Sequence, residues 1–283
     1  MRVTGIHTRS SLGVSRYCAR LADALRAVGI DYVLADRAGA APHWHLANSS
    51  RGVLAQAPLT RRPFVVTGHD LRPRTRALEP LYRLVANPLV LRRAAAVIVH
   101  SSYAASLLAD LRHAHVIPHP ATAFAPIERS AARRVLGWKD EERIALLPGV
   151  PKGTKLVAQA QNLVRAPWRL VVLGAVDDAT YARAFAAADA VLVLRRNSVG
   201  ESNGPLLDAL GAGRAVLATR VGSIPEVAGD AAVLCTPDGI ARGLHELWEM
   251  RAELEEKART RAQELSWNAS ARAHAAVFAE VFG

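Results

Sequence analysis

Short runs of apolar residues alternate along the chain with stretches in which apolar residues recur every three to four positions. The first part of the chain contains six such runs: VTGI (3–6), DYVLA (31–35), WHLAN (44–48), PFVVTGH (63–69), AAVIVHS (95–101) and HVIPH (115–119). Between them, stretches such as 15–29 and 78–94 have the helical period. Strands that alternate with helices are typical of parallel sheets with crossover helices.

The pattern loosens at ATAFAPIERSAA (121–132) and then restarts. Five further runs predict strands: RIALLPG (143–149), RLVVLGA (169–175), AVLVLRR (190–196), AVLAT (215–219) and AAVLC (231–235). A long charged helix follows, and SWNASARAHAAVFAEVF (266–282) predicts a separate last helix. We therefore expect an α/β protein with two doubly wound, Rossmann-like domains, 1–122 and 123–265, that face a cleft, and a separate C-terminal helix, 266–283.

The positive charge is concentrated in the first part of the chain. Residues 1–120 hold sixteen Arg, no Lys and six acidic residues, whereas residues 121–283 hold twenty basic and nineteen acidic residues. A basic half favours an anionic partner, although an ordinary solvated Arg-rich surface explains the count equally well. The fifteen aromatic residues are not interleaved with the basic ones, which argues against a nucleic-acid partner.

The expected compartment and membrane topology follow from three further features of the sequence. No apolar run approaches the roughly 18–20 residues that a membrane span requires, and MRVTGIHTRSS lacks the apolar stretch of a signal peptide. Cys18 and Cys235 have no metal or redox spacing and are expected to be reduced core thiols. We expect a cytoplasmic protein.

The stretch NSVGESNG (197–204) lies between a predicted strand and a helix that begins near Pro205. Proline is tolerated in a first helical turn, Asn203 or Gly204 can cap the helix, and its free N–H groups can bind phosphate. A carboxylate at Glu201 would repel a phosphate unless it accepts hydrogen bonds from hydroxyl groups. Phosphate together with hydroxyls indicates a sugar nucleotide, while the alternative is a plain strand–loop–helix turn with Glu201 in water.

From Glu201 onward the chain resembles the donor motif of retaining glycosyltransferases with the GT-B fold, glycosyltransferase family four. That motif has the form E-x-F-G-x-x-x-x-E, followed by A-x-G-x-P-V-V-A and G-G-x-P-E, and this chain has ESNGPLLDALGAGRAVLAT and VGSIPE. Further stretches occur in the order of the family: SLGVSRY, VVTGHD, VHSSYAASLL, VIPHP, PKG and LSWNASA. The last of them resembles the closing helix of the family, which implies that helix 266–283 packs back on the first domain. The chain is short for this family, so the resemblance implies a compact member.

The resemblance implies a role for each residue of the motif. Glu201 would accept hydrogen bonds from donor-sugar hydroxyls, and the amides of Asn203, Gly204 and Leu206 would hold the diphosphate. Asp208 aligns with the second glutamate of the family, which binds the ribose, but it is one residue closer to Glu201 and has a shorter side chain. The implied donor-binding residues are Gly13, Arg196, Ser202, Asn203, Gly204, Pro205, Leu206 and Asp208.

Three residues outside the motif have implied roles of their own. Lys152 would pair with the departing phosphate, and Arg195 or Arg196 could supply the arginine that the family has near that lysine. His69 resembles the histidine that touches the donor sugar, so we expect His69, Glu201 and Lys152 to be the catalytic residues. His100 and His119 are expected to be structural.

The implied reaction moves a sugar from a UDP-type or GDP-type donor to an acceptor hydroxyl with retention of anomeric configuration, without a metal or other cofactor. The acceptor could be a sugar, a glycolipid or a small molecule. A cluster of arginines in the first domain is expected to contact an anionic membrane surface: Arg72, Arg74, Arg76, Arg83, Arg92 and Arg93. Two alternatives stay open: a sugar-nucleotide-binding protein without turnover, and an epimerase or hydrolase of the same fold.

Overall fold

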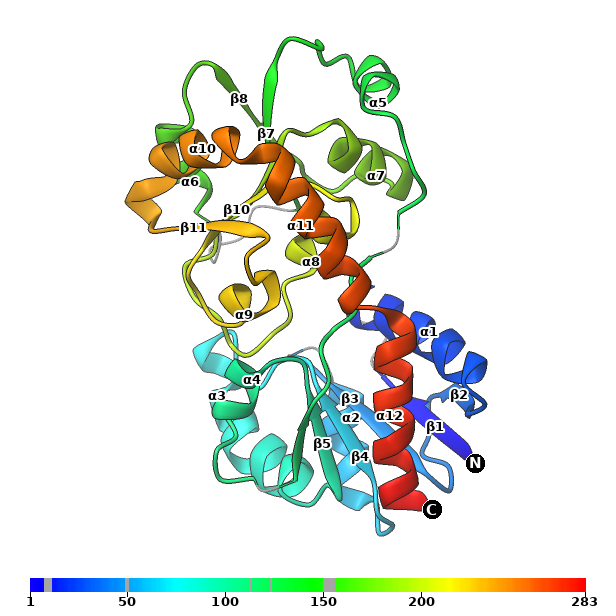
Figure 1. Ribbon diagram of the computed structural model, residues 1–283. Helices are drawn as coiled ribbons and strands as arrows, with labels where there is room; N and C mark the ends of the chain where they lie inside the picture. Colours follow the sequence, from blue (N-terminus) through cyan, green and yellow to red (C-terminus); the bar gives the residue numbers. More distant parts are fainter. Residues whose placement is uncertain (8–11, 49–50, 112, 123, 150–155) are drawn as a thin grey trace. The chain divides into compact units, whose positions relative to one another are not determined.

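The computed structural model describes residues 1–7, 12–48, 51–111, 113–122, 124–149 and 156–283 (Figure 1). The chain divides into two compact units. The first unit contains residues 1–119, 199–202 and 265–283, and the second contains residues 120–198 and 203–264. A short piece of the predicted donor loop therefore packs with the first unit.

The first unit has a six-stranded sheet in the order β2-β1-β3-β4-β5-β6, and every neighbouring pair is parallel. Its strands are β1 (Arg2–Ile6), β2 (Asp31–Ala35), β3 (Pro42–Leu46), β4 (Val65–Gly68), β5 (Ala96–Val99) and β6 (Ala114–Val116). These are the six strands that the apolar runs predict. The prediction is confirmed because parallel strands buried on both faces contain continuous apolar runs.

Helices bury both faces of this sheet. One face carries α1 (Leu12–Ala27) and α12 (Trp267–Phe282), which pack on alternate strand residues such as Val65 and Ile98. The opposite face carries α2 (Arg51–Gln56), η1 (Ala57–Leu59), η3 (Tyr82–Leu91) and α4 (Ser102–Ser106). Val66, Val97 and Val99 point to this second face because successive strand side chains alternate between faces.

The predicted helix 78–94 has an unusual geometry. A 3-10 turn η2 (Arg76–Leu78) and a short α3 (Glu79–Leu81) lead into a π-helix, Tyr82–Leu91. Pro88 lies inside this π-helix, and the Arg92 N–H at its C-terminal end donates to Asn87 O. Proline removes an N–H and its ring conflicts with α-helical packing, so the wider i→i+5 geometry accommodates it.

The second unit has a five-stranded parallel sheet in the order β11-β10-β9-β7-β8. Its strands are β7 (Arg143–Leu147), β8 (Trp168–Val172), β9 (Ala190–Val193), β10 (Val216–Thr219) and β11 (Ala232–Cys235). All five predicted strands are present. In order of appearance the sheet runs 5-4-3-1-2, which is a doubly wound topology.

The helices of the second unit are α5 (Arg129–Leu136), α6 (Val157–Leu163), α7 (Asp178–Ala187), α8 (Gly204–Gly211), α9 (Ile224–Ala228), α10 (Ile240–Glu249) and α11 (Arg251–Glu264), with a 3-10 turn η4 (Pro237–Gly239). One apolar cluster joins α6, α10 and α11 to strands β7, β9 and β10. The sequence predicts one long charged helix over 243–265, but the chain breaks at Met250 into α10 and α11. The break lets Leu247 and Leu254 both reach this cluster.

Each sheet has one position at which the strand order reverses. In the second unit this position lies between β7 and β9, and in the first unit between β1 and β3. Loops that leave adjacent strands at such a position diverge, which opens a ligand site beyond their carboxyl ends. The loop after β9 contains the predicted donor motif. Residues 150–155, which follow β7 in the sequence, lie outside the described residues.

Candidate functional site

The donor motif begins with a turn that requires glycine. Gly200 has φ of +92°, in the left-handed region that side chains other than glycine rarely adopt. A Cβ on Gly200 would lie 3.0 Å from Leu107 Cδ1 and 3.2 Å from Leu71 Cδ1. The N–H groups of Leu71 and Arg72 both donate to Val199 O, each at 3.1 Å. Residues 199–202 are therefore attached to the chain just after β4, inside the first unit.

Glu201 and Ser202 follow this turn. Glu201 is half-buried, and its Oε2 accepts a hydrogen bond from Val199 N at 2.7 Å. Ser202 is also half-buried, and its Oγ is a buried atom without a hydrogen-bond partner among the described residues. Buried hydroxyls are nearly always hydrogen-bonded, so Ser202 Oγ is a candidate to bind a ligand oxygen or a water molecule.

The helix that follows begins as its sequence predicts. Asn203 caps α8, and its side chain accepts from Leu206 N at 3.3 Å. Pro205 occupies the first turn, where the missing N–H has no helical partner. Because Leu206 N is already bonded to Asn203, a phosphate would meet the amides of Asn203 and Gly204 before that of Leu206.

Asp208 lies one turn into α8 and is engaged within the second unit. Its Oδ2 accepts from the Tyr181 hydroxyl at 2.8 Å, and its Oδ1 accepts from the Thr122 hydroxyl. A ribose would therefore share this carboxylate with two protein hydroxyls or displace one of them. The sequence alone does not indicate Thr122 or Tyr181, because their contacts depend on how distant helices and loops pack.

The basic residues of the predicted site are described only in part. Arg196 is exposed just after β9, and the neighbouring Arg195 exchanges backbone hydrogen bonds with the Thr219 hydroxyl. Lys152 lies outside the described residues, in the segment that follows β7. Gly13 lies in the first turn of α1, where an added Cβ would meet nothing within 4 Å.

His69 follows β4 in the first unit. Its ring is buried, and its Nε2 lies 3.2 Å from His45 Nδ1. Burial is the main cause that lowers the pKa of His69 well below its ordinary value, and the neighbouring His100 and His45 lower it further. His69 is therefore neutral at pH 7.

Asp70, Asn48 and Arg74 form a hydrogen-bonded group beside His69. Asp70 Oδ1 accepts from Arg74 Nη2 at 2.7 Å, and Oδ2 accepts from Asn48 N at 2.9 Å. Asn48 also accepts from Arg74 N at 2.9 Å. Burial opposes the charge of Arg74, but Asp70 and then Glu201 outweigh it and raise the pKa of the guanidinium. Glu201 therefore lies in the electrostatic field of the His69–Asp70 strand end.

Histidines and tyrosines continue from His69 into the core of the first unit. The Tyr17 ring is 4.9 Å from His69, 5.3 Å from His100 and 4.8 Å from His119, between ring centroids. His100 Nδ1 lies 3.0 Å from Ile117 O, and its Nε2 has no hydrogen-bond partner among the described residues. The sequence analysis considers His100 and His119 as individual structural residues. It does not predict the cluster that they form with Tyr17 and His69, because the members of this cluster come from separate strands.

No family model and no curated protein matches the chain. Solved structures do match it over its whole length. A sucrose-phosphate synthase from Thermosynechococcus elongatus superposes with a TM-score of 0.79 at 16% identity, over 100% of this chain and 99% of that one. The fold is GT-B.

Two other solved structures have the same fold. Anabaena HepE, solved in complex with UDP, superposes with a TM-score of 0.77 at 14% identity, over 99% of this chain and 100% of that one. WaaG, a glycosyltransferase of lipopolysaccharide biosynthesis, superposes with a TM-score of 0.61 at 14% identity, over 100% of both chains. Identities at this level show the GT-B fold alone.

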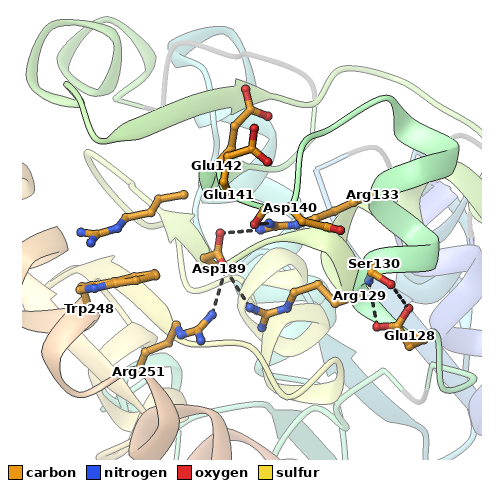
Figure 2. Close-up of a pocket in the computed structure, with 11 residues that line it drawn as sticks. Glu128, Arg129, Ser130, Arg133, Asp140, Glu141, Glu142, Asp189, Trp248 and Arg251 are labelled. Atoms are coloured by element: carbon orange, nitrogen blue, oxygen red, sulfur yellow. Dashed lines mark hydrogen bonds and ion pairs between the residues drawn. The ribbon is translucent and has the colours of Figure 1, made fainter.

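The second unit of this GT-B chain also has a cavity of about 500 Å³ at the amino ends of its strands (Figure 2). Asp189, which precedes β9, lies at its centre and is almost fully buried. Its carboxylate accepts from Arg129 at 2.7 Å, Arg133 at 2.6 Å and Arg251 at 2.9 Å. Because Asp189 engages these guanidinium groups, we assign the cluster a structural role in joining α5 and α11 to the sheet.

Two properties of the described residues bear on metal and membrane binding in this GT-B chain. In the described ranges, no three or more His, Cys, Asp or Glu side chains come together as a metal site. None of the described helices has both the length and the hydropathy of a membrane-crossing segment.

Proposed function

We propose that the chain is a retaining, metal-independent glycosyltransferase that moves a sugar from a nucleoside diphosphate sugar to an acceptor hydroxyl. The observation that carries this proposal is the hydrogen-bonded attachment of the Glu201–Ser202 loop to the strand end that bears His69. The Glu201 carboxylate, the Ser202 hydroxyl, which has no hydrogen-bond partner among the described residues, and the neutral His69 imidazole suit a ligand with many hydroxyl and phosphate oxygens. The solved complexes of HepE with UDP and with UDP-glucose support a UDP-sugar as the first donor to test, with a GDP-sugar as the next.

The proposed roles follow from the chemistry of each group. Glu201 accepts hydrogen bonds from sugar hydroxyls, and Ser202 donates to a phosphate or sugar oxygen. The amides of Asn203 and Gly204, with Lys152, stabilise the charge that grows on the leaving diphosphate, and aligned donors of this kind are worth roughly 3–4 kcal/mol each. The diphosphate oxygen then takes the proton of the attacking acceptor hydroxyl on the same face of the sugar, which gives retention.

Binding of the donor is the first step to test. The melting temperature is measured with UDP, GDP, ADP, dTDP and their sugar conjugates. A ligand at 100 times its dissociation constant adds about 2.7 kcal/mol of stability, which raises the melting temperature by roughly 5 °C or more in a protein of this size. Glu201→Gln and Ser202→Ala should lower the shift, whereas Glu280→Gln, an exposed residue of α12, should keep it.

Turnover is tested separately with the donor that binds. Transfer to a panel of simple sugars is followed by mass spectrometry, and proton NMR coupling constants give the anomeric configuration of the product. A product with inverted configuration would contradict retention, and loss of activity with EDTA would contradict metal independence. Binding without transfer or hydrolysis would instead support a sugar-nucleotide-binding protein, which the engagement of Asp208 with Thr122 and Tyr181 favours as the second candidate.

The acceptor side is proposed to contact an anionic membrane surface through a leucine–arginine patch on the first unit. Its members are Leu59, Leu84, Leu89, Arg83 and Arg93, all exposed. The π-helix brings Leu84 and Leu89 to one side because its bonds join residues five apart. The Arg93 guanidinium binds Pro58 O and Thr60 O, so it lies beside Leu59, which is 78% exposed.

Exposed leucines among arginines suit the boundary between lipid headgroups and acyl chains. Each arginine near an anionic surface contributes about 1 kcal/mol. Sedimentation with vesicles of phosphatidylglycerol should exceed that with phosphatidylcholine, and the double variant Leu84→Ser/Leu89→Ser should lose binding to both. Equal binding of the wild type and the double variant would show that the leucine–arginine patch does not bind the membrane. The structure would then give no support for a glycolipid acceptor.

A further inference from the structure

A continuous row of hydrogen bonds runs through the first unit and ends at His69. Thr67 Oγ1 lies 2.7 Å from His43 Nε2, and His43 Nδ1 lies 2.8 Å from the Tyr32 hydroxyl. The same hydroxyl lies 3.0 Å from His45 Nε2, and His45 Nδ1 lies 3.2 Å from His69 Nε2. The planes of the last two rings differ by 22°, and their centroids lie 5.4 Å apart.

The strands are built to hold this row. His43 and His45 lie two apart on β3, and Thr67 and His69 lie two apart at β4, so each pair shares one face of the sheet. The register places His45 opposite Thr67. Tyr32 lies on β2, and its side chain crosses β1 to reach the histidines of β3. The crossing is possible because β1 has Gly5, which has no side chain, opposite His43.

Gly5 is needed for this crossing. It pairs with His43 in the β1–β3 register, and a Cβ on Gly5 would lie 2.3 Å from the Tyr32 hydroxyl oxygen. Any side chain at this position would push the hydroxyl away from both histidines. The Tyr32 side chain is buried, as are the other side chains of the row.

Proton counting limits the row to two arrangements. Burial, and then the neighbouring histidines, lower the pKa of His43, His45 and His69 well below the ordinary value, so each ring is neutral. A neutral imidazole has one donor and one acceptor nitrogen, and the Tyr32 hydroxyl has one proton. The four hydrogen bonds therefore all point toward His69, or all point away from it.

The Thr67 hydroxyl distinguishes the two directions. Its oxygen is buried, and His43 Nε2 is its only hydrogen-bond partner among the described residues. If the row points away from His69, Thr67 accepts from His43 and its own proton is buried without an acceptor. If the row points toward His69, Thr67 donates and every proton is used. A buried donor without a partner is costly, so the second direction is more stable.

We infer that the row of Thr67, His43, Tyr32 and His45 fixes His69 as the neutral tautomer that carries its proton on Nδ1. His69 then presents an N–H donor to a ligand oxygen rather than a lone pair. Under the proposed function, on which this role rests, His69 binds a hydroxyl of the donor sugar as a hydrogen-bond donor and does not act as a general base. Thr67, His43, Tyr32 and His45 are positioning residues.

The tautomer can be measured without any substrate. Long-range proton–nitrogen spectra of protein labelled with ¹⁵N-histidine distinguish the two neutral tautomers, and His69→Gln identifies the signals of His69. The spectrum at pH 7.5 should show His69 protonated on Nδ1. A spectrum that shows the proton on Nε2 would overturn the inference.

Two pairs of variants test the positioning role. Thr67→Ser keeps the hydroxyl, whereas Thr67→Val removes it with little change in shape. Tyr32→Phe removes the hydroxyl that joins His43 to His45 but keeps the ring. Thr67→Val and Tyr32→Phe should each increase the Nε2–H population of His69 about tenfold, the effect of losing one buried hydrogen bond, and Thr67→Ser should not.

Activity then separates this inference from the proposed function. Thr67→Val should lower kcat about tenfold and leave the dissociation constant for the free nucleoside diphosphate unchanged, and Thr67→Ser should restore kcat. Equal kcat values for the valine and serine variants would overturn the positioning role even if transfer is observed. An Nδ1–H tautomer that these variants shift as expected, in a protein that transfers no sugar, would refute the proposed function and leave the tautomer assignment intact.

Discussion

Acidification should unfold the first unit, because its core contains histidines that are neutral only while they are buried. Burial lowers the pKa of His100 to about 4 and that of His274 to about 4. Burial also lowers the pKa of His43, His45 and His69. In the unfolded chain each of these rings has a pKa of about 6.5.

The sign follows from which state binds more protons. Between pH 6.5 and pH 4 the unfolded chain protonates His100 and His274 and the folded chain does not, so the free energy of unfolding falls as the pH falls. From pH 6.5 to pH 5, each histidine that stays neutral in the folded state lowers the free energy of unfolding by about 2 kcal/mol, at 1.36 kcal/mol per pH unit. His100 and His274 together account for about 4 kcal/mol, and the other three act in the same direction.

This loss is large beside the roughly 5–15 kcal/mol of stability that a folded protein has. Urea unfolding is measured at pH 7.5, 6.5, 5.5 and 5.0 by tryptophan fluorescence, with Trp44 and Trp267 reporting on the first unit. Few carboxylates titrate above pH 5, so the slope of the free energy of unfolding against pH reports the number of histidines that are protonated only in the unfolded chain.

Two variants make the assay specific. His274→Gln removes one buried ring and should reduce the slope near pH 5.5 by about 1.4 kcal/mol per pH unit, whatever it does to stability at pH 7.5. His245→Gln, in an exposed part of α10, should leave the slope as it is. A free energy of unfolding that stays constant from pH 7.5 to pH 5, or a slope that His274→Gln does not change, would refute the reasoning.

Three further substitutions test the packing of the second unit by urea denaturation at pH 7.5. Arg133→Met should cost about 3–5 kcal/mol, because the buried Asp189 loses a partner at 2.6 Å; a loss below 1 kcal/mol would show that Arg129 and Arg251 suffice. Gly211→Ala should destabilise by about 1–3 kcal/mol or more, because its Cβ would fall 1.7 Å from Thr122 O; an unchanged midpoint would contradict this close approach. Asn203→Ala should cost about 1 kcal/mol through loss of the α8 cap, and Asn203→Asp, which can still cap, should recover most of it.

The strands of both sheets could be predicted from the sequence because parallel strands covered on both faces are nearly all apolar. The pattern of Val65, Val66 and the run 96–99 needs no tertiary information to be recognised. The π-helix at Tyr82–Leu91 and the break at Met250 could not be predicted in the same way. Both preserve the helical spacing of apolar residues, and their geometry depends on Pro88 and on the cluster that Leu247 and Leu254 enter.

The part of the candidate site that lies in a single loop could be predicted from the sequence. The part that is assembled from the ends of several strands could not. Asn203 is recognisable as a cap because its residue type and the following Gly-Pro are local signals. Asn48 and Arg74, which surround Asp70, carry no such signal, since their contacts join the ends of β3 and β4. Lys152 stays a prediction.

The row behind His69 did leave a trace in the sequence. In PHWHL (42–46) and VVTGH (65–69), polar side chains occupy alternate positions of strands that are otherwise apolar. The face they share is covered by α1 and α12, where burial of a polar group costs free energy unless it is hydrogen-bonded. Packing alone would favour valine or isoleucine at His43, His45 and Thr67. Polar residues at such positions conflict with the pattern around them, and conflicts of this kind in a foldable sequence are expected at functional sites. The alternation of His, Thr and His toward a strand end is therefore the signal that could have connected His69 to its supporting residues, once the register of β3 and β4 was known.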